Sequence, residues 1–361
     1  MALKWPIIQF KTYLFVLSLF TCLPIYASEF CHNFYLSQNK VTSISFRDQV
    51  PIEIKNTLQQ ITNGINLTLF KNLIVAESIS VNIAADNQPS AMGHFIGLPR
   101  RLLKKSRLIS FIKNKWGTLL TNGELGMFLH EFTHATLTTN WMMGIPGYKN
   151  MMGDYESLIL QDRQFESRFE SLENGKKNRT ISEAEYEKGR MVLNVEMTIH
   201  QQNKLTNEQL IFLNSTYQEF LADLAPVLYF KDPKIVVEGI KASAKHQLYR
   251  TDLKIDDIYS EAQLAERDFG IDYYKDSADF QNVDGAHAML TPLRYFSWTY
   301  FSNNGNYKQP HLVFEQFYRA VTQVFAAEIQ FLNRESKIFT PIQRVEKIKA
   351  ALETEKSTSQ N

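Results

Sequence analysis

The sequence predicts an α+β fold, in which a small N-terminal sheet lobe precedes a mostly helical C-terminal lobe. Alternating, strand-like segments occur only in the first third of the chain, and helical spacing of apolar residues dominates after it. Hydrophobic residues make up 44% of the chain, with 25 Phe and 16 Tyr, so a large core can form. We expect one domain over 28–361, with a mixed α/β lobe at 28–140 and a mainly helical lobe at 141–361.

Residues 1–27 have the pattern of an export signal. Lys4 and Lys11 form a basic start, an apolar run extends from Tyr13 to Leu23, and Ala27 offers a small-residue cleavage site. The run is shorter than the roughly 20 residues of a membrane span. We therefore expect a secreted or periplasmic protein, which would touch a membrane only through an uncleaved leader.

The two cysteines bear on how the chain is exported and whether it can form a disulfide. Cys22 offers an alternative lipoprotein attachment site, but Phe20 and Thr21 before it fit that signal poorly. Cleavage after residue 27 leaves Cys31 as the one thiol, so no internal disulfide is expected. The core or a bound metal must then hold the fold.

The charge balance excludes one class of partner. The chain has 39 basic and 38 acidic residues, a formal net charge of +1. Nucleic-acid-binding proteins carry a clear basic excess, so no nucleic-acid partner is expected.

In the mixed lobe, apolar spacing predicts one helix and two strands. Residues 51–61 carry apolar side chains at helical intervals. Ser78–Ile83 alternates between polar and apolar residues, as a half-buried strand does. Gly93–Pro99 predicts a second strand, which the proline ends.

A further helix is predicted after these strands, from Thr121 to about Thr139. Thr121–Glu124 combines a polar cap with an acidic residue in the first turn, which is typical of a helix start. The apolar spacing continues to about Thr139, and a Met-rich loop is expected over Trp141–Gly147.

The remainder is predicted to be helical. Residues 154–204 are highly charged and indicate exposed helices. Thr206–Gln209 has the capping-box pattern and opens a helix that Pro226 should end or kink. Pro341 starts a last amphipathic helix, and the polar segment 353–361 is expected to be a flexible tail.

One motif predicts a metal site, the segment His130–His134, which reads His-Glu-Phe-Thr-His. Two histidines four residues apart share one face of a helix, where both imidazoles can bind one Zn²⁺. Glu131 lies beside them, placed to polarise a metal-bound water. Burying two histidines and a glutamate without a cation would be costly, which disfavours a purely structural role.

A catalytic zinc needs a third protein ligand and an open position. In one compact zinc pattern, a glycine and a third histidine follow the second histidine by three and six positions. That pattern is absent here, because these positions hold Leu137 and Asn140. Glu219 is the better candidate, since it and Asp223 share one helix face among apolar residues. The same spacing in Glu183–Glu187 lies in a charged stretch and indicates a solvated face. Asp223 can accept the second N–H of a metal-binding histidine.

His-Glu-x-x-His on one helix with Glu-x-x-x-Asp on a later helix resembles the gluzincin metallopeptidases, the thermolysin-like clan. The resemblance implies a zincin-like fold with zinc on His130, His134 and Glu219. It also implies Glu131 as the general base and Asp223 as the residue that orients His130. The likeness covers two helices, and the interval between them is far longer than in thermolysin.

The resemblance also implies a mechanism. Zinc polarises the scissile carbonyl, and Glu131 passes a proton from water to the leaving nitrogen. A further donor must stabilise the oxyanion; His287 is the first candidate, then Tyr295 and Arg294, although a capping histidine and a structural arginine would fit the same sequence. The strand ending at Pro99 is expected to be the substrate-binding edge strand.

Three hypotheses therefore stand. The first is an active zinc peptidase that hydrolyses peptide or protein substrates. The second is a zinc-binding but non-proteolytic protein, a binding or assembly factor of the cell envelope. The third, a purely structural envelope protein, leaves the metal motif unexplained. An intact Glu131 favours the first. The sequence does not reveal the substrate, endo- or exo-cleavage, or the oligomeric state.

Overall fold

The computed structural model describes most of the chain from residue 41 onward. The described residues are 41–46, 50–84, 90–92, 95–99, 120–248, 259–274, 280–281, 283, 285–303 and 306–358. The expected export signal lies outside them. No helix among the described residues is long and apolar enough to cross a membrane. The chain divides into two compact units, and each is presented by itself.

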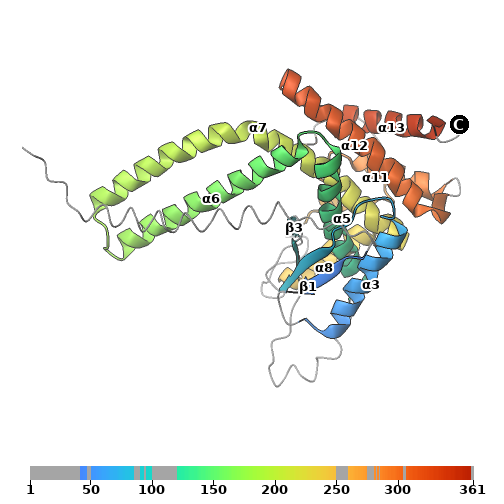
Figure 1. The fold of residues 1–361 in the computed structure, drawn as a ribbon, viewed down its shortest axis with the longest axis horizontal. Coiled ribbons are helices and arrows are strands. Elements are labelled where there is room, and N and C mark those ends of the chain that lie inside the picture. Colours follow the sequence, from blue (N-terminus) through green and yellow to red (C-terminus); the bar gives the residue numbers. More distant parts are fainter. Residues whose placement is uncertain are drawn as a thin grey trace, which may run out of the picture. The chain divides into compact units, whose positions relative to one another are not determined.

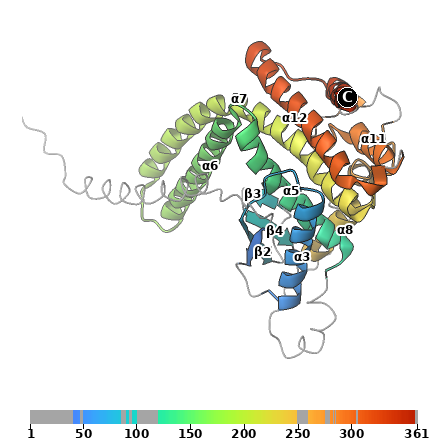
Figure 2. The ribbon, with the colours of Figure 1, turned by 45° about the vertical axis from the view of Figure 1, so that its right-hand side comes forward.

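The first unit includes Met152–Met197 and is a helical hairpin. It is built from most of α6 (Tyr148–Lys177) and the beginning of α7 (Glu183–Phe230), which lie side by side in Figures 1 and 2. The two helices approach closely where Gly189 faces Leu172, since a Cβ on Gly189 would lie 2.7 Å from a Leu172 methyl group. The expected charged helices of 154–204 are thus present.

The second unit holds the sheet and the other helices. Its four described strands are β1 (Ser43–Phe46), β2 (Ser78–Ala84), β3 (Ser90–Met92) and β4 (Phe95–Pro99). The mixed α and β composition, mostly helical with a small N-terminal sheet, is as predicted. In β2 the alternate residues Ile79, Val81 and Ile83 are buried, as the period of two requires.

The strand order corrects one prediction. The sheet runs β1-β2-β4-β3, with β1, β2 and β4 parallel and β3 antiparallel to β4. The strand ending at Pro99 is therefore not the edge strand, because β4 pairs on both sides. The edge beside it is β3, a short strand whose residues gave no clear alternation in the sequence.

Among the described residues, the other secondary-structure elements of this unit are helices. They are α3 (Ile52–Thr68), α5 (Asn122–Gly144), the second half of α7, α8 (Ile235–Leu248), α9 (Glu261–Ala265), α11 (Thr291–Ser302), the 3₁₀ turn η2 (Asn306–Lys308), α12 (Pro310–Glu335) and α13 (Pro341–Thr358). The predicted helix at 51–61 is confirmed and continues to Thr68. Helix α5 contacts β3, β4, α3 and α8, which makes it the central helix of this part of the unit.

Helix α5 begins as predicted but ends later. The Thr121 side chain accepts from the Glu124 N–H, and the Glu124 carboxylate accepts from the Thr121 N–H at 2.7 Å, a complete capping box. The expected loop over Trp141–Gly147 is wrong in its first half, because the helix continues to Gly144. Trp141 is fully buried and packs on Phe325 at a ring-centroid distance of 4.8 Å, so tertiary packing extends the helix.

The later helices also differ from prediction. Thr206–Gln209 does not open a helix and Pro226 does not end one, because α7 runs unbroken to Phe230. An N-cap residue typically contributes only about 1 kcal/mol, so the pattern at Thr206 is a weak local signal. A proline inside a helix costs roughly 3 kcal/mol, and at Pro226 the packing of the fully buried neighbours Leu224, Ala225 and Val227 keeps the helix continuous. Within the polar segment 353–361, the expected tail, helix α13 extends through Thr358.

A buried ion pair joins three of these helices. Glu328 on α12 and Arg344 on α13 are both fully buried and meet at 2.8 Å. Glu328 also accepts from the Phe339 N–H at 2.6 Å and from the Tyr217 hydroxyl on α7 at 2.5 Å. This network fixes α7 two residues before Glu219, the expected metal ligand.

Helices α5 and α8 approach through two glycines, and a methyl group there is expected to destabilise the fold. A Cβ on Gly239 would lie 2.6 Å from the Gly123 carbonyl oxygen, a backbone atom that cannot rotate away. We expect Gly239→Ala to lower the free energy of unfolding by about 1–3 kcal/mol, measured by urea denaturation. Gly144→Ala is the control, since no atom lies within 4 Å of that Cβ. Equal stability of the two variants would contradict the close packing.

Candidate metal centre

Two histidines of α5 and one glutamate of α7 converge on a single point. The Nε2 atoms of His130 and His134 lie 3.1 Å apart. Glu219 faces both imidazoles, with one oxygen 3.4 Å from His130 Nε2 and the other 3.5 Å from His134 Nε2. Each residue offers one ligand atom, and the three atoms lie within 4.8 Å of one another, so the group could hold a metal ion.

A second set of residues orients the two imidazoles. His130 Nδ1 lies 2.9 Å from an Asp223 oxygen, the contact that the sequence suggested. His134 Nδ1 lies 3.0 Å from Gln218 Oε1. The Gln218 amide nitrogen donates to Thr138 at 3.1 Å and to the Tyr148 hydroxyl at 3.0 Å, which fixes its oxygen toward His134.

These contacts determine which ring nitrogens carry protons. The Asp223 carboxylate and Gln218 Oε1 are acceptors, so Nδ1 of His130 and of His134 must donate. When both rings are neutral, the two Nε2 atoms then present bare lone pairs to each other and to the Glu219 carboxylate. Such a group of acceptors is unfavourable unless a cation lies among them. The donor set, two imidazoles and one carboxylate, fits Zn²⁺ and other first-row divalent metals.

The pKa values of His134 and Glu219 also indicate that a positive charge is favourable between these residues. Burial opposes charge on His134, but the Glu219 carboxylate outweighs it and raises the His134 pKa to about 9. Burial likewise opposes ionisation of Glu219, and the two imidazoles hold its pKa well below the usual range. Without a metal, a proton on His134 therefore compensates Glu219, and a bound metal ion would replace that proton.

Asp223 is fully buried and binds two arginines besides His130. Arg267 donates to it through Nε at 3.0 Å and through Nη2, and Arg294 donates through Nε at 3.0 Å and Nη2 at 2.8 Å. Burial opposes ionisation, yet the two guanidinium groups hold the pKa of Asp223 far below that of a free aspartate. An ionised Asp223 is thus available to His130 at any ordinary pH.

The three candidates for oxyanion stabilisation have different surroundings. His287 Nδ1 lies 3.0 Å from Glu219 Oε2 and 3.0 Å from Arg267 Nη1, and its side chain is 52% exposed. Arg294 is buried against Asp223 and donates to the His287 carbonyl at 2.5 Å, so it holds the loop that carries His287. Tyr295 is half-buried on α11, and none of the contacts just described involves it.

No family model, curated protein or solved structure matches this chain. Sequence reasoning identified the residues that converge in the metal centre, and it missed Gln218, Arg267 and Tyr148. A signal for Gln218 did exist, because it is an uncharged polar residue next to Glu219 in an apolar helix segment.

Gln218→Met is expected to weaken metal binding about 10–100-fold, because outer residues that orient a histidine ligand typically have effects of that size. The substitution removes the acceptor of His134 Nδ1 and leaves the volume similar. Competition with a chelator of known affinity measures the change. Gln209→Met, at an exposed position of the same helix, is the control. Equal metal affinity of the two variants would exclude a role for Gln218.

Proposed function

We propose that this chain is an exported zinc metallopeptidase of the gluzincin type. One observation carries the proposal: the Nε2 atoms of His130 and His134 converge on the carboxylate of Glu219 in a group that could hold a metal ion, and Glu131 lies on the helix of the two histidines. The helix with both histidines following a small sheet, and the later helix with Glu219 and Asp223, support a zincin-like fold.

Glu131 has the properties of a general base. Its side chain is buried, with 4% exposure, and burial raises its pKa to about 8. Bases near neutrality transfer protons most effectively at physiological pH. We infer that Glu131 takes a proton from the attacking water and delivers it to the leaving nitrogen of the peptide.

Zinc, when bound, would supply Lewis-acid polarisation of the scissile carbonyl and lower the pKa of water. The remaining residues hold the centre in place. Asp223 and Gln218 keep both imidazoles facing Glu219. His287 is the exposed donor beside the centre, and we assign it the stabilisation of the oxyanion. Arg267 and Arg294 position Asp223 and the loop of His287.

The test begins with the chain from Ser28 onward, the product of the expected leader cleavage. We expect one zinc ion per chain by elemental analysis and cleavage of peptides in a mixed library, read by mass spectrometry. Removal of the metal with a chelator should abolish cleavage, and added zinc should restore it. Absence of stoichiometric metal would refute the proposal. Metal without cleavage of any peptide would favour the zinc-binding, non-proteolytic alternative.

A further inference from the structure

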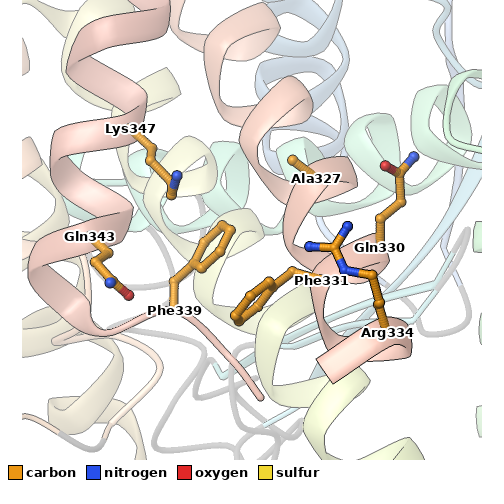
Figure 3. Close-up of a pocket in the computed structure, with 7 residues that line it drawn as sticks. All are labelled: Ala327, Gln330, Phe331, Arg334, Phe339, Gln343 and Lys347. Carbon is orange, nitrogen blue, oxygen red and sulfur yellow. The ribbon is translucent and has the colours of Figure 1, made fainter. Parts of the chain in front are cut away.

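A cavity lies between helices α12 and α13, and none of its lining residues belongs to the metal centre. Its volume is about 370 Å³, near the lower end of the range for small-molecule sites, about 300–1,000 Å³. Phe331 and Phe339 lie between the two helices and form its apolar part (Figure 3). Their ring centroids are 5.0 Å apart at an interplanar angle of 33°. The cavity thus has room and an aromatic surface for one compact organic group.

The two charged residues that line the cavity are both basic. Arg334 on α12 and Lys347 on α13 lie on either side of the two rings (Figure 3). The Lys347 ammonium lies over the Phe339 ring, 4.8 Å from its centroid, in a cation–π contact. None of the described residues that line the cavity is acidic.

Arg334 and Lys347 both have N–H groups that can still donate hydrogen bonds to a ligand. Arg334 binds the neighbouring Glu335 through Nε at 2.8 Å, and its two terminal nitrogens can still donate. Lys347 has three donors, and among the described residues its ammonium contacts the Phe339 ring and forms no ion pair with an acidic side chain. Gln330 and Gln343 add amide groups at the rim of the cavity.

We propose that this cavity binds a small organic carboxylate with an aromatic or aliphatic body. The body packs on the rings of Phe331 and Phe339, and the carboxylate lies between Arg334 and Lys347. Size selects a single compact group, the aromatic surface selects an apolar body, and the two cations select a negative charge. The residues that line the cavity and those of the metal group are different, so we expect the acid to bind with or without the metal.

The probe is 3-phenylpropionate, titrated into the full chain by ligand-observed NMR and calorimetry. Its neutral amide, 3-phenylpropanamide, has the same body without the charge. We expect the acid to bind at least about tenfold more tightly than the amide, because a charge-assisted hydrogen bond is roughly twice as strong as a neutral one. Equal affinity of acid and amide, or no binding of the acid at millimolar concentration, would overturn the proposal.

Variants locate the site on the molecule. Arg334→Gln combined with Lys347→Gln is expected to weaken binding of the acid about tenfold and leave the amide unchanged. Lys349→Gln is the matched control, since Lys349 on the same helix lies over the Phe296 ring at 4.9 Å, outside the cavity. Thermal unfolding checks that all variants fold. A loss of acid binding in Lys349→Gln as large as in the double variant would also overturn the proposal.

Discussion

Glu131→Gln is expected to abolish peptide cleavage while metal binding is retained. The glutamine has nearly the same shape but cannot take a proton, so the general-base contribution is lost. Such contributions are typically about 10²–10⁴-fold in rate. Glu131 is not one of the three converging ligands, and the stoichiometry of bound metal should stay the same. Cleavage rates and metal content, measured on the same preparations, test both parts.

The Glu131→Gln variant is expected to keep the stability of the wild type. Burial raises the pKa of Glu131 to about 8, which means that its surroundings already favour the neutral carboxyl group. A neutral amide of the same shape is therefore expected to keep or slightly raise the melting temperature. Lost activity in Glu131→Gln would then reflect chemistry rather than unfolding.

Two companion variants distinguish the roles. Glu219→Gln removes a metal ligand and should lose both bound metal and cleavage. Glu187→Gln, on the exposed part of the same helix α7, should change neither. If Glu131→Gln cleaved peptides at the wild-type rate, Glu131 would not be the base. If it lost the metal as well, Glu131 would belong to the ligand set.

The local features of the centre could be predicted from sequence because they depend on spacing along one helix. His130 and His134 are four positions apart, and so are Glu219 and Asp223, so each pair shares a helix face. Buried polar residues in apolar segments then indicated that the two faces meet. The strand at Ser78–Ile83 and the start of α5 at Thr121 were predictable for the same reason, from local period and capping.

The residues that position the centre could not be predicted in this way. His134 and Gln218 are 84 residues apart, and Asp223 and Arg267 are 44 apart. No periodicity connects such pairs, and an arginine next to an aspartate in a short polar segment is typical of a surface. Arg267 becomes recognisable only when folding places it on Asp223.

Helix ends were mispredicted where tertiary packing competes with local signals. The capping pattern at Thr206 and the proline at position 226 both lie inside α7. The sequence predicts a Met-rich loop that begins at Trp141, yet the packing of Trp141 on Phe325 and its hydrogen bond to Thr322 keep it helical. A cap contributes about 1 kcal/mol and a helical proline costs roughly 3 kcal/mol, and the burial of several large apolar side chains outweighs both.

Asp223→Asn is expected to be the most destabilising single substitution in the centre. Asp223 is fully buried and neutralises Arg267 and Arg294, which are also buried. Removing one partner of a buried ion pair typically costs about 3–5 kcal/mol, because the remaining charges lose their compensation. Denaturant unfolding of Asp223→Asn should therefore show a large loss, whereas Asp272→Asn at an exposed position should show almost none.

The pH dependence of that loss has a definite sign. The folded pKa of Asp223 is far below that of a free aspartate, about 3.9. Its contribution to stability is therefore complete well above that unfolded value and is lost progressively as the pH falls from there to the lower folded value. The difference between wild type and Asp223→Asn should stay constant from pH 5 upward and shrink in stronger acid.

A double variant separates charge from shape. Arg294→Met removes the most buried of the two guanidinium groups, whose side chain is 1% exposed. If uncompensated charge causes the loss, Arg294→Met combined with Asp223→Asn should be more stable than the sum of the single effects predicts, by about 1–3 kcal/mol. Strict additivity would mean that Asp223 acts through shape alone. In either case the freed His130 should bind metal more weakly, since Asp223 is the acceptor that aims its Nε2 at the centre.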